Sequence, residues 1–101
     1  MSAFLTLSVR ETDDAVVVAA SGEVDSSNAA QLFEALQSIA QSSRIVVDLT
    51  TCTFFDSACL SVLTRFAKQR RLAGKPFNVL ANKSGRRVLE ITGLIQPLHV
   101  A

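Results

Sequence analysis

Residues that build metal and redox centres are scarce in this chain. It contains two cysteines, Cys52 and Cys59, and a single histidine, His99. A structural zinc site takes four nitrogen or sulfur ligands, so three such side chains are too few. The sequence therefore argues against a structural metal, and no motif in it points to a bound cofactor.

Glycine clusters and long apolar runs are absent as well. The four glycines are scattered along the chain, so they form no phosphate-cradling loop. No apolar run approaches the roughly 20 residues that cross a bilayer, and the first residues lack a basic segment followed by an apolar export signal. We expect a cytoplasmic protein that is not inserted into a membrane.

Neither sign of charge dominates. Ten lysines and arginines balance nine aspartates and glutamates, which leaves a net charge of +1. No overall field then attracts nucleic acid or anionic lipid, so a nucleic-acid partner is not expected. One basic stretch is typical of a solvated helix face; it comprises Arg65, Lys68, Arg70, Arg71 and Lys75.

The chain does contain enough apolar material for one core. Apolar residues make up 49% of its 101 residues, and a chain of this length leaves no room for a second core. We therefore expect a single domain over residues 1–101.

Hydrophobic periodicity divides the chain into strands and helices. Alternating and β-branched runs predict strands at residues 4–10, 15–20, 44–49 and 77–81, with an edge strand at 97–100. Helical spacing predicts a helix after the cap candidates Ser26, Ser27 and Asn28, a second between Asp56-Ser57 and Gly74, and a third between Ser84 and Gly93. This order indicates an α/β fold with a mixed sheet of about five strands, opened by an antiparallel hairpin.

No constellation of side chains supports catalysis. A serine nucleophile needs a base within hydrogen-bond reach, but His99 lies on the expected edge strand near the end of the chain. Ser57 also lacks the Gly-x-Ser-x-Gly setting in which strained nucleophiles occur. We expect no enzymatic activity from the remaining candidates, which are Glu23, Asp25, Asp48, Asp56 and Cys59.

Asp56 and Ser57 lie at an expected strand-to-helix junction. The simpler interpretation is that either side chain caps the following helix. The functional interpretation is that Ser57 accepts a phosphate, because free N–H groups and the positive end of the helix dipole favour the added negative charge. A partner bound over that helix end would be displaced, since it would have to desolvate a near-dianion beside Asp56.

Three motifs together resemble a known family. Residues 45–63 combine Ile-Val-Val-Asp-Leu, Thr-Phe-Phe-Asp-Ser and the apolar Leu60, Val62 and Leu63. Gly-Glu-Val-Asp at residues 22–25 precedes the first expected helix, and Arg-Arg-Val-Leu-Glu-Ile-Thr-Gly-Leu at 86–94 covers the third. In this order and spacing the motifs resemble the STAS domains of anti-sigma factor antagonists, over about residues 5–98.

The resemblance implies a STAS-type sandwich with helices mainly on one face of the sheet, and a bacterial binding switch in place of an enzyme. Similar proteins, when unphosphorylated, bind an anti-sigma factor that is also a serine kinase, and so free the sigma factor for transcription. The kinase phosphorylates the serine after the aspartate, here Ser57, and a PP2C-type phosphatase removes the phosphate. The implied partner-binding residues are Asp25, Ser26, Asp56, Ser57, Ala58, Cys59 and Ser61.

The sequence departs from the family pattern just after Ser57. Relatives commonly have a second hydroxyl and then a glycine, whereas this chain has Ala58 and Cys59. Ser57 is thus the only acceptor in the motif, and a side chain replaces bare backbone at a position that bears on partner choice. Many relatives also continue into a fourth helix, so an open sheet face or edge is expected here, in a monomer or a weak homodimer.

Other interpretations stay open. Cys59 would fall in the first turn of the second helix, where the dipole favours the thiolate, and oxidation of the Cys52–Cys59 pair would then switch partner binding off. Alternatively, both cysteines are small buried apolar residues. A different function on the same fold is that of a permanent adaptor subunit of a membrane lipid-transport ATPase, which needs no phosphorylatable serine.

Overall fold

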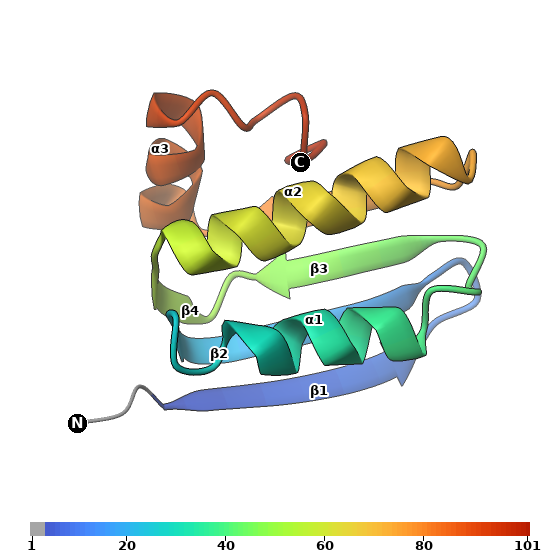
Figure 1. Cartoon of the computed structure of the whole chain (residues 1–101), viewed down its shortest axis with the longest axis horizontal. Coiled ribbons are helices and arrows are strands. Elements are labelled where there is room, and N and C mark those ends of the chain that lie inside the picture. Colours follow the sequence, from blue (N-terminus) through green and yellow to red (C-terminus); the bar gives the residue numbers. More distant parts are fainter. Residues whose placement is uncertain (1–3) are drawn as a thin grey trace.

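The structure is a computed structural model that describes residues 4–101. Each helix follows one or two strands along this part of the chain, and the three helices and four of the strands are those that the periodicity predicts (Figure 1). The strands are β1 (Leu5–Glu11), β2 (Val16–Val24), β3 (Ile45–Leu49), β4 (Cys52–Phe55) and β5 (Phe77–Ala81). The helices are α1 (Ala29–Ser38), α2 (Ser57–Leu72) and α3 (Lys83–Ile91).

The strands form one mixed sheet organised around β2. β1 runs antiparallel to β2 as the expected hairpin, and β3 and β4 both pair in parallel with β2. β3 pairs with the first part of β2, from Val16 to Ala19, and β4 pairs with its last part, from Gly22 to Val24. β5 lies beyond β3, also in parallel. Because β2 and β4 are parallel neighbours, the residues that follow these two strands leave the sheet at the same edge.

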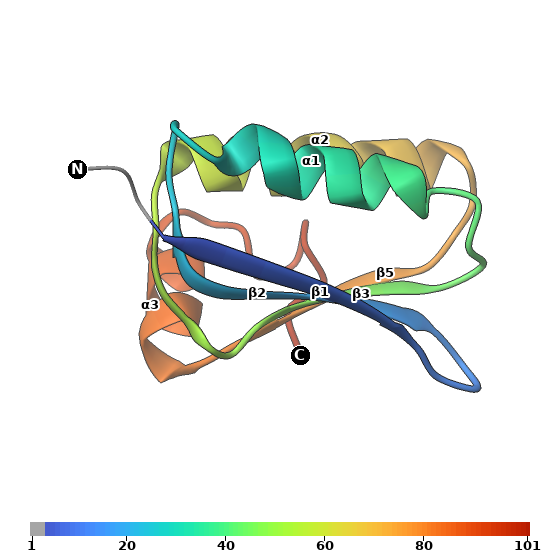
Figure 2. The ribbon, with the colours of Figure 1, turned by 90° about the horizontal axis from the view of Figure 1, so that it is seen from below.

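Two helices cover one face of the sheet. Figure 2 shows α1 and α2 above the sheet and α3 at one end of it, away from the α1 and α2 layer. In β3, Ile45, Val47 and Leu49 belong to the buried core, whereas Val46 and Asp48 alternate with them and are only half-buried. The predicted α/β architecture with a mixed, open sheet of five strands is therefore confirmed.

Two expectations about the strands are wrong. Residues 97–100 form no edge strand but a single bridge between Val79 and Val100, because Pro97 lacks an N–H donor and His99 has a φ of 50°. The fifth strand is instead β4, which the sequence pattern leaves inside the connection before α2. Both Thr53 and Phe54 are exposed in this short strand, so it shows no simple alternation that would reveal it.

The N-cap predicted for α3 is wrong, whereas one of the candidates predicted for α1 does occupy the N-cap position. Asn82, and not Ser84, caps α3, where its Oδ1 accepts a hydrogen bond of 2.8 Å from the Gly85 N–H. Asn28 does occupy the N-cap position of α1, but its side chain makes no capping hydrogen bond. The side chain of Asn28 can therefore form hydrogen bonds elsewhere in the β2–α1 connection.

Candidate functional site

The N-terminus of α2 is built by Asp56. Its carboxylate accepts a hydrogen bond of 2.9 Å from the Ala58 N–H, which is the bond expected of an N-cap aspartate. The Leu60 N–H donates to the Asp56 carbonyl oxygen at 3.1 Å, which closes the first turn. Asp56 thus performs the capping that the simpler interpretation assigns to either side chain of the pair.

Ser57 is the first residue of α2 and is exposed. Its hydroxyl makes no hydrogen bond to any other residue that the structure describes. The Ser57 side chain therefore does not contribute a hydrogen bond to the fold. It stands at the positive end of the helix dipole, where an added anion is favoured.

The β2–α1 connection lies directly beside this helix end. β2 and β4 pair up to Val24 and Phe55, and the Asp56 N–H then donates to the Val24 carbonyl oxygen at 3.2 Å. Asp25 and Asp56 consequently leave the sheet side by side, 31 positions apart in sequence but on neighbouring strands.

The carboxylate of Asp25 is held within its own loop. Its Oδ1 accepts hydrogen bonds from the Ser27 hydroxyl at 2.5 Å and from the Ser27 N–H at 2.8 Å. These bonds lower the pKa of Asp25 below its ordinary value, and the bond from the Ser27 hydroxyl has the largest effect. The carboxylate is therefore ionised at neutral pH.

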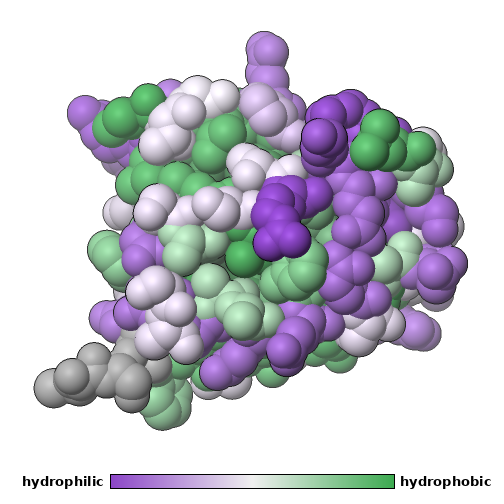
Figure 3. All heavy atoms as spheres, viewed as in Figure 1, coloured by the Kyte–Doolittle hydropathy of each residue, from purple (hydrophilic) through white to green (hydrophobic). Residues whose placement is uncertain are grey.

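Most of the predicted partner-binding residues share this corner of the molecule. Ser26, Ser57 and Ser61 are exposed, Asp25 and Asp56 are half-buried, and Ser61 lies one helical turn beyond Ser57. We name this group the α2 N-terminal surface; it comprises Asp25, Ser26, Asp56, Ser57 and Ser61. Figure 3 shows pale and apolar colours over the N-terminal end of α2, and mostly hydrophilic colours over its C-terminal half, with one apolar patch near the end of the helix.

Ala58 and Cys59 do not belong to this surface in the same way. Ala58 is half-buried against the core, and Cys59 is completely buried in it. Cys59 shares the inward face of α2 with Leu63 and Phe66, at helical spacing. The prediction that Cys59 contacts a partner is therefore wrong for this conformation, because its side chain points into the core and leaves the helix surface unchanged.

Both thiols are buried in the folded protein. Burial raises the pKa of Cys59 to about 12, with smaller contributions from nearby Cys52 and Asp56. Burial also raises the pKa of Cys52, whose thiol donates to the Phe54 carbonyl oxygen at 3.2 Å. Desolvation outweighs the helix dipole at Cys59, so the alternative in which both cysteines are buried apolar residues is the one that fits. The proposed redox switch needs an accessible thiolate, and neither buried cysteine provides one.

Residues 4–101 contain no group of three histidine, cysteine, aspartate or glutamate side chains that lie close enough together to hold a metal ion. None of the helices described is both long and apolar enough to span a membrane.

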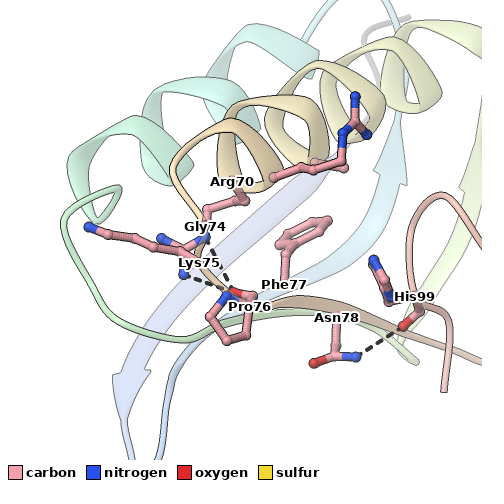
Figure 4. A pocket seen from close by; sticks show the side chains of 9 residues that line it. Arg70, Gly74, Lys75, Pro76, Phe77, Asn78 and His99 are labelled. Atoms are coloured by element: carbon pink, nitrogen blue, oxygen red, sulfur yellow. Dashed lines mark hydrogen bonds between the residues drawn. The ribbon is translucent and has the colours of Figure 1, made fainter.

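A hollow of about 410 Å³ lies at the opposite end of α2 (Figure 4). None of the predicted site residues lines it. Its walls include Arg70, which the sequence pattern places on a solvated face but which is 1% exposed. The guanidinium of Arg70 donates to four backbone carbonyls, so the residue is part of the core; the acceptors are Ala40, Ser42, Ser43 and Pro76.

Comparisons with known proteins agree with this fold. A family model described as "Mlab, STAS domain" matches residues 7–99. An anti-sigma factor antagonist from Mycobacterium paratuberculosis is 26% identical, with a TM-score of 0.86 over 96% of this chain and 85% of that chain.

Two forms of the Bacillus protein SpoIIAA share the fold at lower identity. Its unphosphorylated form, an anti-sigma factor antagonist, is 19% identical, with a TM-score of 0.77 over 95% of this chain and 88% of that chain. Its phosphorylated form is 17% identical, with a TM-score of 0.73 over 95% of this chain and 91% of that one.

Proposed function

This chain belongs to the STAS domain family, and on that premise we propose that it is an anti-sigma factor antagonist controlled by phosphorylation of Ser57. The unphosphorylated protein, with residues 1–101 as one STAS domain, binds an anti-sigma factor that has serine kinase activity. That binding frees the sigma factor for transcription. The antagonist is the kinase's substrate and is not itself an enzyme, and a PP2C-type phosphatase restores it.

This proposal is supported mainly by the Ser57 hydroxyl, which is exposed and makes no hydrogen bond to another described residue. Because Asp56 already caps α2, a phosphate on Ser57 would replace no hydrogen bond of the fold. The helix dipole and the free N–H groups of the first turn favour the added charge. The folded state would therefore tolerate the modification.

The same phosphate would disturb a bound partner. It adds a charge of about −1.5 to −2 to a surface that already carries the carboxylates of Asp25 and Asp56. A partner that covers the surface would have to desolvate these charges, so phosphorylation switches binding off.

The experiment is to incubate the protein with candidate anti-sigma kinases, ATP and Mg²⁺, and to locate added phosphate by mass spectrometry. We expect one phosphate on Ser57, its loss in Ser57→Ala, and weaker kinase binding once it is present. Ser84→Ala is the matched control, because it removes an exposed hydroxyl from the first turn of another helix, α3, outside the α2 N-terminal surface, so Ser57 should still be phosphorylated in it. Phosphate found only at other residues would contradict the proposal.

A second candidate is a permanent adaptor subunit of a membrane lipid-transport ATPase. The matching family model carries the name Mlab and not that of an antagonist, which favours keeping this candidate. Ser57→Asp separates the two functions. It should abolish binding in the switch, whereas an adaptor should assemble with Ser57→Asp and Ser57→Ala alike.

A further inference from the structure

Two polar side chains are buried in the part of the chain that the structure describes, Arg70 and Asn28. Arg70 lies in the last turns of α2 and donates hydrogen bonds to backbone carbonyls there. Asn28 is 4% exposed and lies in the β2–α1 connection, next to the α2 N-terminal surface. A buried amide needs hydrogen-bond partners, so the partners of Asn28 indicate what it holds in place.

The Asn28 side chain turns away from the helix that it begins. An N-cap asparagine normally accepts a hydrogen bond from the second or third N–H of its helix, but Asn28 makes none. Its Oδ1 instead accepts from the Asp25 N–H at 3.0 Å, and its Nδ2 donates to the Glu23 carbonyl oxygen at 3.0 Å. Both bonds connect the start of α1 back to the end of β2.

These bonds hold Asp25 from several sides. The Asp25 N–H is bound by the Asn28 side chain, and the Asp25 carbonyl oxygen accepts from the N–H groups of Asn28 at 3.2 Å and Ala29 at 2.8 Å. The Asp25 carboxylate is bound by Ser27. The residue just before, Val24, is fixed to α2 through the Asp56 N–H. The loop at residues 25–27 therefore has one defined position relative to Ser57.

We propose that Asn28 is a positioning residue for partner binding. It fixes the loop at residues 25–27 so that Asp25 and Ser26 meet the anti-sigma factor together with Ser57. Asn28 itself touches no partner, because it is buried. This inference rests on the proposed function, since it assumes that the α2 N-terminal surface is where the partner binds.

The test compares Asn28→Ala with Asn28→Asp and with a control, Leu36→Val, in the full chain. Leu36 is buried on α1 but lies toward the other end of that helix, so Leu36→Val lowers stability without touching the loop. The first measurement is hydrogen exchange of the Asp25 amide by NMR. The second is the affinity of the unphosphorylated protein for its anti-sigma kinase.

Asn28→Ala should speed exchange of the Asp25 amide and weaken kinase binding, each by about tenfold or more, as expected for the loss of a buried hydrogen bond. Asn28→Asp keeps the acceptor for the Asp25 N–H but loses the donor to Glu23. It should therefore retain more of the amide protection, and it serves as the probe if Asn28→Ala does not fold. Leu36→Val should leave both quantities close to those of the wild type.

Two results would overturn the inference. Protection of the Asp25 amide that survives in both Asn28 variants would show that the side chain does not fix the loop. A mobile loop with unchanged kinase affinity would show that the loop does not position the partner. Failure of the proposed function is distinguishable, because the wild type would then bind no kinase while the exchange measurement still reports on the loop.

Discussion

The guanidinium of Arg70 donates a hydrogen bond of 2.8 Å to the carbonyl oxygen of Ser42, 28 positions earlier in the chain. Further bonds from the same side chain reach Ser43 and Pro76, so the last turn of α2 is tied to the connections before β3 and β5. The charge has no carboxylate partner among these contacts, and desolvation lowers the pKa of Arg70. A buried cation is here satisfied entirely by backbone carbonyls.

Arg70→Met should therefore destabilise the protein strongly. It keeps much of the buried volume but removes the donor to the carbonyl oxygens of Ala40, Ser42 and Ser43, while the Pro76 oxygen keeps the Ile45 N–H at 3.4 Å. The expected cost is about 3 kcal/mol or more in the free energy of unfolding. Arg71→Met, on the exposed neighbour, should change this quantity by less than about 0.5 kcal/mol. Urea unfolding of both variants checks the difference, and equal effects would show that the Arg70 bonds contribute little.

The buried thiol of Cys59 predicts a loss of stability at alkaline pH. Its pKa is raised from an ordinary 9.0 to about 12, so the unfolded chain releases the thiol proton at a pH where the folded protein retains it. The free energy of unfolding should fall as the pH rises from about 9 toward 12, and it should fall less steeply in Cys59→Ala. Urea titrations at pH 8 and pH 10.5 measure both slopes.

The same burial predicts slow thiol labelling. At pH 8 neither Cys52 nor Cys59 should react with a thiol reagent at an appreciable rate in the native protein, and both should react once it is unfolded in urea. Rapid native labelling of either cysteine would restore the redox interpretation.

The Asp25 carboxylate should titrate below its ordinary pKa of 3.8, mainly because the Ser27 hydroxyl donates to its charged form. Ser27→Ala should raise the pKa of Asp25, whereas Ser26→Ala, an exposed neighbour, should not. The stability that these bonds add is present above the ordinary pKa and is lost as the pH falls through the lowered one. NMR titration of the Asp25 side-chain carboxyl carbon tests this, and no difference between the two variants would rule it out.

Gly22 in β2 should tolerate no side chain. Its φ is +96°, and a Cβ there would lie 2.2 Å from the Phe4 carbonyl oxygen. Gly22→Ala should lower the free energy of unfolding by about 2 kcal/mol or more, because strain adds to a backbone clash. Gly74→Ala is the control: φ is +67° there, but a Cβ would meet nothing within 4 Å, so only the conformational cost of about 1 kcal/mol is expected. Thermal unfolding of the two variants separates these contributions.

The sequence alone determined the three helices, four of the five strands and the location of the candidate site, but it missed β4 and predicted an edge strand at residues 97–100 that does not form. The spacing of Leu32 and Leu36, the β-branched run in β3 and the Asp56-Ser57 junction are all local signals, readable within a few residues. The motif around Ser57 is equally local, which is why the resemblance to STAS domains could be identified before the fold.

Only the tertiary structure decided which side chains of the site are available. The resemblance to STAS domains implies that Cys59 binds a partner, and the charge pattern places Arg70 on a solvated face, yet both side chains are buried. The acceptors of Arg70 and the pairing of β4 with β2 come from segments about 30 residues away. A polar or small residue can be buried when backbone from distant parts of the chain supplies its hydrogen bonds and contacts. Local periodicity describes only neighbouring residues, so it cannot predict which distant backbone will lie there.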